Sequence, residues 1–432
     1  MKEYKQSILI MMSIIFIPMV VWAFNQNVAD FSVRTDVDAN SIEEIKVAPN
    51  DCRTEDQFGR AVDVSGNTSI VGAYGNDDRA DNAGAAYMLH FDGQIWQPIQ
   101  KLSPIDGDEY DYFGCSVAIE RNYAIIGAYG DDDHGNNSGS AYVFTKDNDF
   151  WYELTKLKAQ DSQASDYFGC SVDISGKYII VGAYGAQDNG SHSGAAYIFV
   201  REDNGVYQQQ KLIVGDAQPF DYFGYSVSIS GNYAIIGAYG KTYHGEKSGA
   251  AYIFKRMGRR WRQLIKLVPS DGAMNDYFGR SVSISGEYAI VGAIGKDDSG
   301  KDAGAVYIFK RSGYYWFRYA KIIPSSIRKN YCFGTSVNLS DGYAIIGAQG
   351  DEMNGMRTGA AYVYQLEQHR WKQVALFRPQ DGSDDDFFGC SVAISGQRII
   401  AGAYGNDENG EKSGAAYLYG LFSSYVNKYS IK

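Results

Sequence analysis

A Phe-Gly pair recurs seven times along this chain at a constant interval of 55 residues, with no insertion or deletion between copies. The phenylalanines are Phe58, Phe113, Phe168, Phe223, Phe278, Phe333 and Phe388. A tyrosine keeps the same phase in every unit, at Tyr87, Tyr142, Tyr197, Tyr252, Tyr307, Tyr362 and Tyr417. A fixed repeat of this length indicates stacked copies of one supersecondary unit, and it overrides the roughly three domains that a 432-residue length would suggest.

Each unit reads as four short β-strands. In the unit that starts at Phe113 they are "FGCSVAI", "YAIIGAYG", "SGSAYVF" and "WYELTKL", and the first alternates with Phe113, Cys115, Val117 and Ile119 on one face. The 49 glycines and 35 tyrosines agree with Gly-rich turns between aromatic strands. No segment has a helical period, so the chain is expected to be all-β.

Seven units of four antiparallel strands predict a seven-bladed β-propeller with 55-residue blades. A linear β-solenoid is the alternative, but its rungs are usually shorter, and a closed ring removes exposed end strands. The segment Ile42 to Asp51, "IEEIKVAPND", aligns with fourth-strand segments such as "LTKLKAQD". We therefore expect the N-terminal segment to complete the last blade.

The strand that opens "FGxSV", followed by a strand that ends "VGA" or "IGA", resembles the FG-GAP repeat of integrin α-chain N-terminal propellers. This resemblance implies the propeller fold and, in many members, a calcium cage of the form DxDxDGxxD in the first hairpin. Here that hairpin reads "SISGEY", "DISGKY" or "AIERNY", which lacks the carboxylates, so the calcium role does not carry over to it. "GAYG" also stands where "GAP" is usual.

The N-terminal residues predict export. Residues 1–24 combine a polar, basic start with the apolar run Ile8 to Phe24, which is typical of a signal peptide cleaved after Ala23 or of an uncleaved N-terminal anchor. Residues 25–41 form a lead-in and residues 42–432 the propeller, which is expected to be secreted or at the cell surface. The five cysteines are an odd number without a CxxC pair, so free thiols are expected and any disulfide pairing stays open.

Charge is predicted to be polarised between the two faces of the ring. The loops between second and third strands and the connections between blades share one face, here called the top face, and they carry more negative charge than the net −11 of the chain. An acidic chain with a pI of about 5.0 excludes a nucleic-acid role, and a membrane would be contacted only through an uncleaved N-terminal segment. An aspartate two residues before Phe-Gly recurs in six units: Asp56, Asp111, Asp166, Asp221, Asp276 and Asp386. These carboxylates either ring the channel mouth or, as we favour, fix the turn between blades.

The sequence contains candidates for a calcium site and for glycosylation sites. In the loop "GDDDHGNNSG", Asp131, Asp133 and Asn136 could bind Ca²⁺ weakly, although a solvated turn is the favoured interpretation. No other cofactor is expected. If the host glycosylates exported proteins, the sequons at Asn67, Asn136 and Asn189 are candidates, whereas Asn338 falls within a predicted first strand.

Nothing in the sequence indicates catalysis. The chain has no GxSxG, HExxH or P-loop motif, and Ser116 belongs to a serine that recurs in every "FGxSV" strand. We expect a non-catalytic binding module that recognises protein or glycan through its top loops. The alternatives are a structural surface or matrix repeat protein and a hydrolase that uses the central channel. The sixth unit, preceded by the basic "PSSIRKNYCFG", departs most from the pattern.

Overall fold

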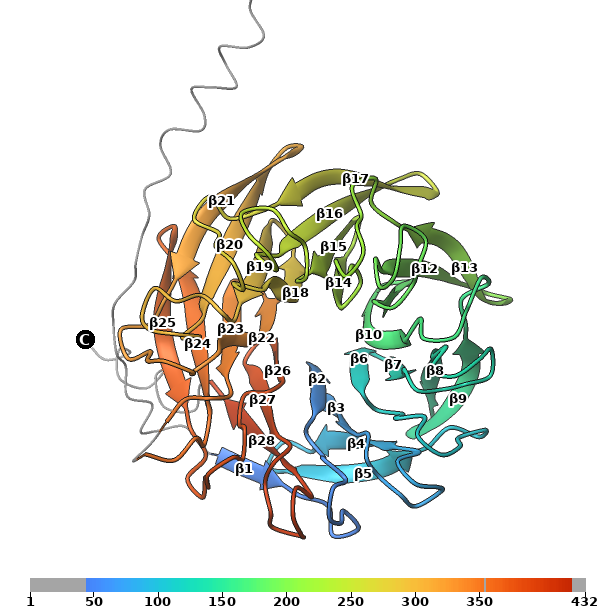
Figure 1. Ribbon diagram of the computed structural model, residues 1–432. Helices are drawn as coiled ribbons and strands as arrows, with labels where there is room; N and C mark the ends of the chain where they lie inside the picture. The colour runs from blue at the N-terminus through green and yellow to red at the C-terminus, as the bar shows by residue number, and fades with distance from the viewer. Residues whose placement is uncertain (1–43, 353–354, 422–432) are drawn as a thin grey trace, which may run out of the picture.

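A computed structural model describes residues 44–352 and 355–421, and all regular structure within them is β-strand. Seven four-stranded antiparallel sheets form a closed ring around a central channel (Figure 1), which confirms the predicted seven-bladed propeller. No helix in the described part of the chain is long and apolar enough to cross a membrane. The predicted signal peptide or anchor (1–24) and the lead-in (25–41) lie outside the described residues.

Each of the first six blades takes four consecutive strands, ordered from the channel to the rim. These are β2–β5 (Ala61–Ser65, Thr68–Ala73, Ala85–Phe91, Trp96–Leu102), β6–β9 (Ser116–Glu120, Tyr123–Ala128, Ser140–Asp147, Phe150–Leu157), β10–β13 (Phe168–Ser175, Tyr178–Ala183, Ala195–Glu202, Gly205–Leu212), β14–β17 (Ser226–Ser230, Tyr233–Ala238, Ala250–Met257, Arg260–Leu267), β18–β21 (Phe278–Ser285, Tyr288–Ala293, Ala305–Ser312, Tyr315–Ile322) and β22–β25 (Phe333–Ser340, Tyr343–Ala348, Ala360–Glu367, Arg370–Phe377). The seventh blade combines β26 (Val392–Ser395), β27 (Arg398–Ala403) and β28 (Ala415–Gly420) with β1 (Glu44–Val47).

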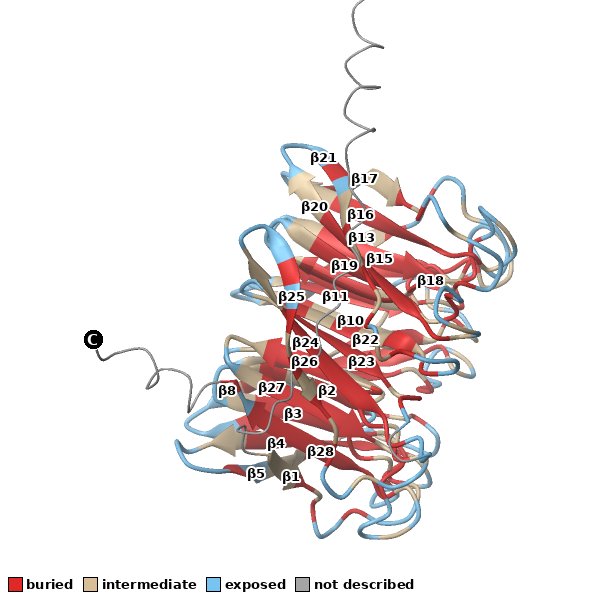
Figure 2. Cartoon of the chain, turned by 90° about the vertical axis from the view of Figure 1, so that its left-hand side faces the viewer, coloured by how far each residue is buried: buried red, intermediate tan, exposed pale blue. Residues whose placement is uncertain are grey.

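The hydrophobic core lies between neighbouring blades. The second strand of a blade, such as β7, is buried at every residue after its first, because a sheet covers each of its faces. One core cluster joins Ile70 of the first blade to Phe113 and Ile126 of the second. Figure 2 shows buried residues along the strands and exposed residues in the loops at both ends. Each blade therefore depends on its two neighbours for burial of its apolar side chains.

The Phe-Gly and Gly-Ala pairs of the repeat are explained by contact between blades. A Cβ added at Gly72 would lie 2.0 Å from the carbonyl oxygen of Gly114 in the next blade. Gly114 itself has φ +94°, and a Cβ there would lie 2.3 Å from the carbonyl oxygen of Ala85. The two glycines allow the inner backbones of adjacent blades to touch, and no other residue fits this space.

The predicted first strand is wrong in one detail. Phe113 does not continue into β6 but forms an isolated bridge with Gly84 of the preceding blade, and the strand begins at Ser116. The left-handed glycine turns the chain here, so Phe113 is fully buried between blades while Cys115 lines the channel. The expected alternation that placed Cys115 on the same face as Phe113 therefore fails.

The N-terminal strand completes the last blade, as expected. β1 pairs antiparallel with β28, from Glu44 opposite Tyr419 to Val47 opposite Ala416. A second set of contacts also joins the ends of the ring, because the backbone amide of Phe58 donates to the carbonyl of Ser413 at 3.0 Å. The ring is closed both at the rim and near the channel.

Candidate binding surface at the top face and the channel

Lysines from the outermost strands reach up into the acidic top loops. In six blades a lysine pairs with the carboxylate of the incoming connection: Lys46 with Asp381, Lys101 with Asp51, Lys156 with Asp106, Lys211 with Asp161, Lys266 with Asp216 and Lys321 with Asp271. The repeated tyrosine of the blade donates its hydroxyl to the same carboxylate, as Tyr142 does to Asp106 at 3.0 Å. Because these lysines lie outside the loops, the loop sequences overstate how acidic the top face is.

The loop singled out by sequence, 130–139, is held by one of these lysines. The ammonium of Lys156 lies 2.5 Å from Asp131 and 2.7 Å from Asp133. Hydrogen bonds from Lys156 and Lys158 lower the pKa of Asp133 to about 2. The structure thus brings Asp131 and Asp133 together around a protein cation, whereas the exposed Asn136 side chain accepts from Asn137. A metal ion at these two carboxylates would have to displace Lys156.

The aspartates that recur before Phe-Gly fix the turns between blades. Asp111 is buried, and its carboxylate accepts a 2.8 Å hydrogen bond from the backbone amide of Asp108. The equivalent bond, to an amide three residues earlier, is made by Asp56, Asp166, Asp221, Asp276 and Asp386. This geometry supports the favoured interpretation of a structural turn.

A belt of half-buried tyrosines surrounds the mouth of the channel. The residue before Phe-Gly and the tyrosine of "GAYG" stack in pairs, with ring centroids 4.9 Å apart for Tyr167 and Tyr184 and 5.0 Å for Tyr222 and Tyr239. Further contacts, 6.1 Å between Tyr184 and Tyr222 for example, link the pairs from blade to blade. The belt contains Tyr74, Tyr112, Tyr129, Tyr167, Tyr184, Tyr222, Tyr239 and Tyr277.

The belt depends on a left-handed backbone. Tyr112 has φ 57° and Tyr110 has φ 62°, values that non-glycine residues rarely adopt. The backbone amides of both residues donate to the loop of the preceding blade, to Asn82 and Asp81 respectively, at 3.0 and 2.8 Å. These inter-blade hydrogen bonds offset the conformational cost and aim the ring of Tyr112 at the channel mouth.

The belt is interrupted at the fifth and sixth blades. Ile294 and Gln349 replace the "GAYG" tyrosine, and Cys332 replaces the residue before Phe-Gly. In the sixth blade Arg378 takes over from the lysine, with its guanidinium 2.8 Å from the fully buried carboxylate of Asp351. The connection 324–331 that enters this blade exposes Arg328 and buries the Tyr331 side chain where other blades place aspartate. The departure seen in sequence therefore coincides with a gap in the belt.

Below the belt lies a channel of about 520 Å³ lined by the inner strands. The residue after each Phe-Gly pair faces it: Arg60, Cys115, Cys170, Tyr225, Arg280, Thr335 and Cys390. The recurring serine is engaged between blades, since the Ser116 hydroxyl donates to the carbonyl of Gly169 at 2.7 Å. All five cysteines, including Cys52 and Cys332 outside this ring, are free thiols, as expected.

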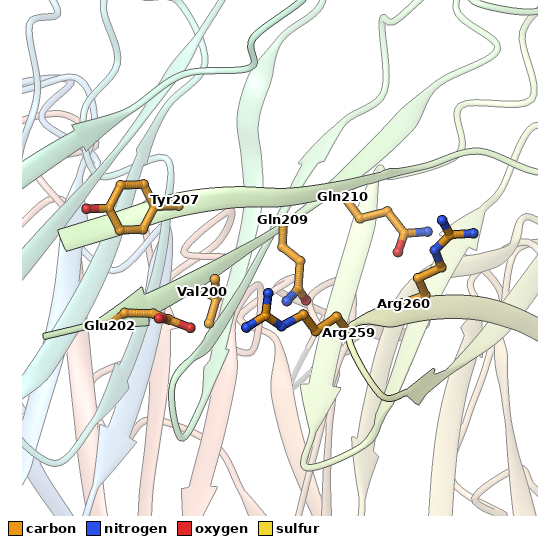
Figure 3. A pocket seen from close by; sticks show the side chains of 7 residues that line it. All are labelled: Val200, Glu202, Tyr207, Gln209, Gln210, Arg259 and Arg260. Atoms are coloured by element: carbon orange, nitrogen blue, oxygen red, sulfur yellow. The ribbon is translucent and has the colours of Figure 1, made fainter. Parts of the chain in front are cut away.

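A second hollow of about 640 Å³ lies on the bottom face, between the hairpins of the third and fourth blades. Figure 3 shows Arg259 pointing toward Val200 and Gln209, with Tyr207 and Glu202 at the far end. It is an open groove between two hairpins.

Comparison with known families supports the repeat assignment. The FG-GAP repeat model matches seven segments, 42–89, 96–144, 151–199, 206–254, 261–309, 316–364 and 371–419, which together cover most of the chain. This chain is an FG-GAP repeat protein. Each matched segment runs from the outer strand of one blade to the third strand of the next, so the matches and the blades are offset by one strand. A search of curated proteins found no match.

The FG-GAP propeller places the sequon asparagines in different settings. Asn136 and Asn189 are exposed in top loops, and Asn67 is exposed in the turn between β2 and β3. Asn338 lies within β22 as expected, and its Oδ1 accepts the backbone amide of Ile394 in the next blade at 3.2 Å. Glycosylation at the first three positions stays a prediction.

Sequence reasoning missed two features of this FG-GAP propeller. The periodic lysines were visible at a 55-residue spacing, but only the structure shows that their ammonium groups reach the carboxylates of the connection that enters the same blade. The pairing of channel arginines with tyrosines joins different blades, and no spacing in the sequence indicates it.

Proposed function

We propose that this FG-GAP propeller is an extracytoplasmic, non-catalytic binding module that recognises a protein or glycan through its top face. The observation that carries the proposal is the tyrosine belt, a half-exposed aromatic surface that spans neighbouring blades at the mouth of a channel. Tyrosine offers a large contact area and a hydroxyl at low conformational cost, and it is enriched in recognition surfaces. The acidic loops that surround the belt would favour a partner with basic or hydrogen-bonding groups.

The arrangement of the polar side chains supports a non-catalytic role. Ser116 donates to a backbone carbonyl, and Asp111 accepts a backbone amide in a turn, so neither is poised as a nucleophile with an adjacent base. His134 and His244 share a repeat phase but belong to non-adjacent blades.

The belt can be tested with two double variants of the exported protein. Labelled wild type, Tyr167→Ala/Tyr222→Ala and a control, Tyr152→Ala/Tyr207→Ala, are applied to a glycan array and to cell surfaces. The control tyrosines lie on outer strands and are 49% and 46% exposed, outside the belt. We expect saturable binding that falls at least tenfold in the belt variant, by loss of about 1.4 kcal/mol or more, and stays unchanged in the control. Equal binding by all three proteins would refute recognition through the belt.

The sixth blade provides a second test. Its incoming connection, 324–331, is exchanged for the acidic connection 269–276 of the fifth blade, which has the same length. If the basic connection contributes partner contacts, binding is lost while the melting temperature stays within a few degrees. Unchanged binding would assign recognition to the tyrosine-rich side of the mouth instead.

A further inference from the structure

Two arginines project into the channel without an acidic partner. Arg60 of the first blade and Arg280 of the fifth occupy the same repeat position, directly after Phe-Gly, and both line the channel. Within residues 44–352 and 355–421, neither guanidinium donates a hydrogen bond to the protein or lies within 4.0 Å of a carboxylate. This contrasts with the six outer-strand lysines of the top face, each of which pairs with a carboxylate.

Tyrosine rings hold the two guanidinium groups in place. Arg60 lies over the ring of Tyr404, 5.0 Å from its centroid. Arg280 lies over Tyr225 at 4.2 Å and near Tyr239 at 5.5 Å. A ring face attracts a guanidinium but neither neutralises it nor satisfies its five N–H donors. The arginines are therefore positioned with their hydrogen-bonding capacity free.

The negative groups of the channel are committed elsewhere. Asp63 and Asp173 also line the channel, each about three residues after the position that follows Phe-Gly on its inner strand. At the usual rise of a strand, this places them roughly 10 Å from the level of the arginines. Their carboxylates accept the backbone amides of Ile119 and Ile229 in neighbouring blades, each at 2.7 Å.

The thiols of the channel do not supply negative charge either. Burial raises the pKa of the Cys115 thiol to about 11, so at neutral pH this thiol is uncharged. The Cys170 thiol behaves in the same way, with a pKa raised to about 12 by burial. The upper channel at the level of the arginines therefore has an excess of positive charge.

The two cations line the same channel. The pKa of Arg280 is lowered to about 10, first by burial and then by the positive charge of Arg60. At neutral pH both groups stay charged, so the channel contains two cations that repel each other. An anion that enters between them would be stabilised by both and would relieve this repulsion.

We propose that the channel is a binding site for an oxyanion, the carboxylate, sulfate or phosphate group of a small ligand, held by Arg60 and Arg280. A planar guanidinium donates two parallel hydrogen bonds to such a group, which a spherical halide cannot accept in the same way. The channel volume of about 520 Å³ accommodates a small molecule whose body reaches up to the tyrosine belt. This site is separate from the top-face recognition proposed above and does not depend on it.

The experiment uses the full chain and three probes: sodium sulfate, sodium phosphate and sodium glucuronate. Each is titrated calorimetrically at pH 7 against a sodium chloride solution of equal ionic strength, which separates binding from screening. The site variant is Arg60→Thr/Arg280→Thr, because Thr335 occupies the equivalent position in the sixth blade. The control is Arg259→Thr/Arg260→Thr, which removes two arginines from the bottom groove instead.

We expect saturable binding of the oxyanions by wild type and control, weakened at least tenfold in the site variant. Tighter binding of glucuronate than of the inorganic ions would identify the ligand group as a carboxylate on a sugar. Tighter binding of sulfate or phosphate would identify it as a dianionic group. Binding no stronger than in matched chloride, or equal binding by the site variant, would overturn the proposal. A melting curve in chloride alone checks that the site variant folds. If the double variant does not fold, the single variant Arg60→Thr, at an exposed channel position, is compared with wild type in the same titrations.

Discussion

At the scale of single residues, one position of the repeat shows how different side chains fit the same backbone. The residue twenty positions after the recurrent aspartate, or after Tyr331 in the sixth unit, is Asn76, Asp131, Ala186, Lys241, Lys296, Asp351 or Asn406. In the fourth blade Lys241 and Asp221 form a buried ion pair at 2.8 Å. In the second blade two buried acids, Asp111 and Asp131, occupy the same places. Burial first, and the charge of Asp131 to a lesser extent, raise the pKa of Asp111 to about 7.

This pair makes a prediction about pH. The folded-state pKa of Asp111 is above its unfolded value. The stabilisation that this shift gives to the folded state is therefore present below about pH 4 and is lost as pH rises toward 7. Asp131→Asn removes the neighbouring charge. Between pH 5 and pH 8, the free energy of unfolding of the variant should therefore fall by about 1 kcal/mol less than that of wild type. Urea unfolding at both pH values measures the difference.

The first blade supplies the matched control. Its amide Asn76 donates to Asp56 at 2.9 Å, and Asn76→Asp should steepen the loss of stability with pH. Parallel pH profiles for wild type and both variants would show that the two acids do not interact.

At the scale of elements, the edge of the last blade depends on a strand of four residues. Without β1, the strand β28 would present unpaired backbone groups and the apolar surface of the seventh blade. Val47 is buried, and Lys46 bridges Asp381 and Glu408. β1 therefore provides backbone pairing, apolar burial and an ion-pair network at one place.

Removal of this strand should destabilise the whole ring. A chain without residues 1–47 is predicted to be less stable than one without residues 1–41 by about 3–6 kcal/mol, from the burial of two aliphatic side chains and the ladder hydrogen bonds. Thermal unfolding measures the effect, and size-exclusion chromatography detects association through the open edge. Equal melting temperatures for the two chains would mean that closure near the channel suffices.

The elements also show what the sequence could predict. A 55-residue period with four alternating segments determines the number of blades and strands, and the match of Ile42 to Asp51 with fourth strands determines how the ring closes. The break after Phe113 was missed because it arises from contact with the preceding blade, through Gly84. The paired lysines and the unpaired arginines depend on which loops meet in space, and periodicity does not encode that.

At the scale of the molecule, the acidic top face is partly neutralised from within. Six lysines of the outer strands and Arg378 reach its loops, and carboxylates such as Asp132 stay exposed. Divalent cations should therefore associate weakly with the whole surface rather than with one loop.

Calcium is predicted to raise the melting temperature only modestly at millimolar concentration, and sodium chloride should reproduce part of the effect by screening. The shift should persist in Asp131→Asn/Asp133→Asn, because Lys156 already occupies the space between these carboxylates. Calorimetric titration of wild type and double variant tests this. Tight, saturable binding that is lost in the variant would instead establish an ordered site at Asp131 and Asp133.

The closure of the ring also sets an order of events during synthesis. Glu44 is made early, but its hydrogen-bond partner Tyr419 follows 375 residues later. At a typical elongation rate of about 5–20 residues per second, β1 waits roughly 20–75 seconds for its neighbour. Until then the nascent protein is an open row of blades whose first strand has no sheet to join. A chaperone or export machinery that keeps this segment from pairing with another chain would determine how much of the protein reaches the closed state.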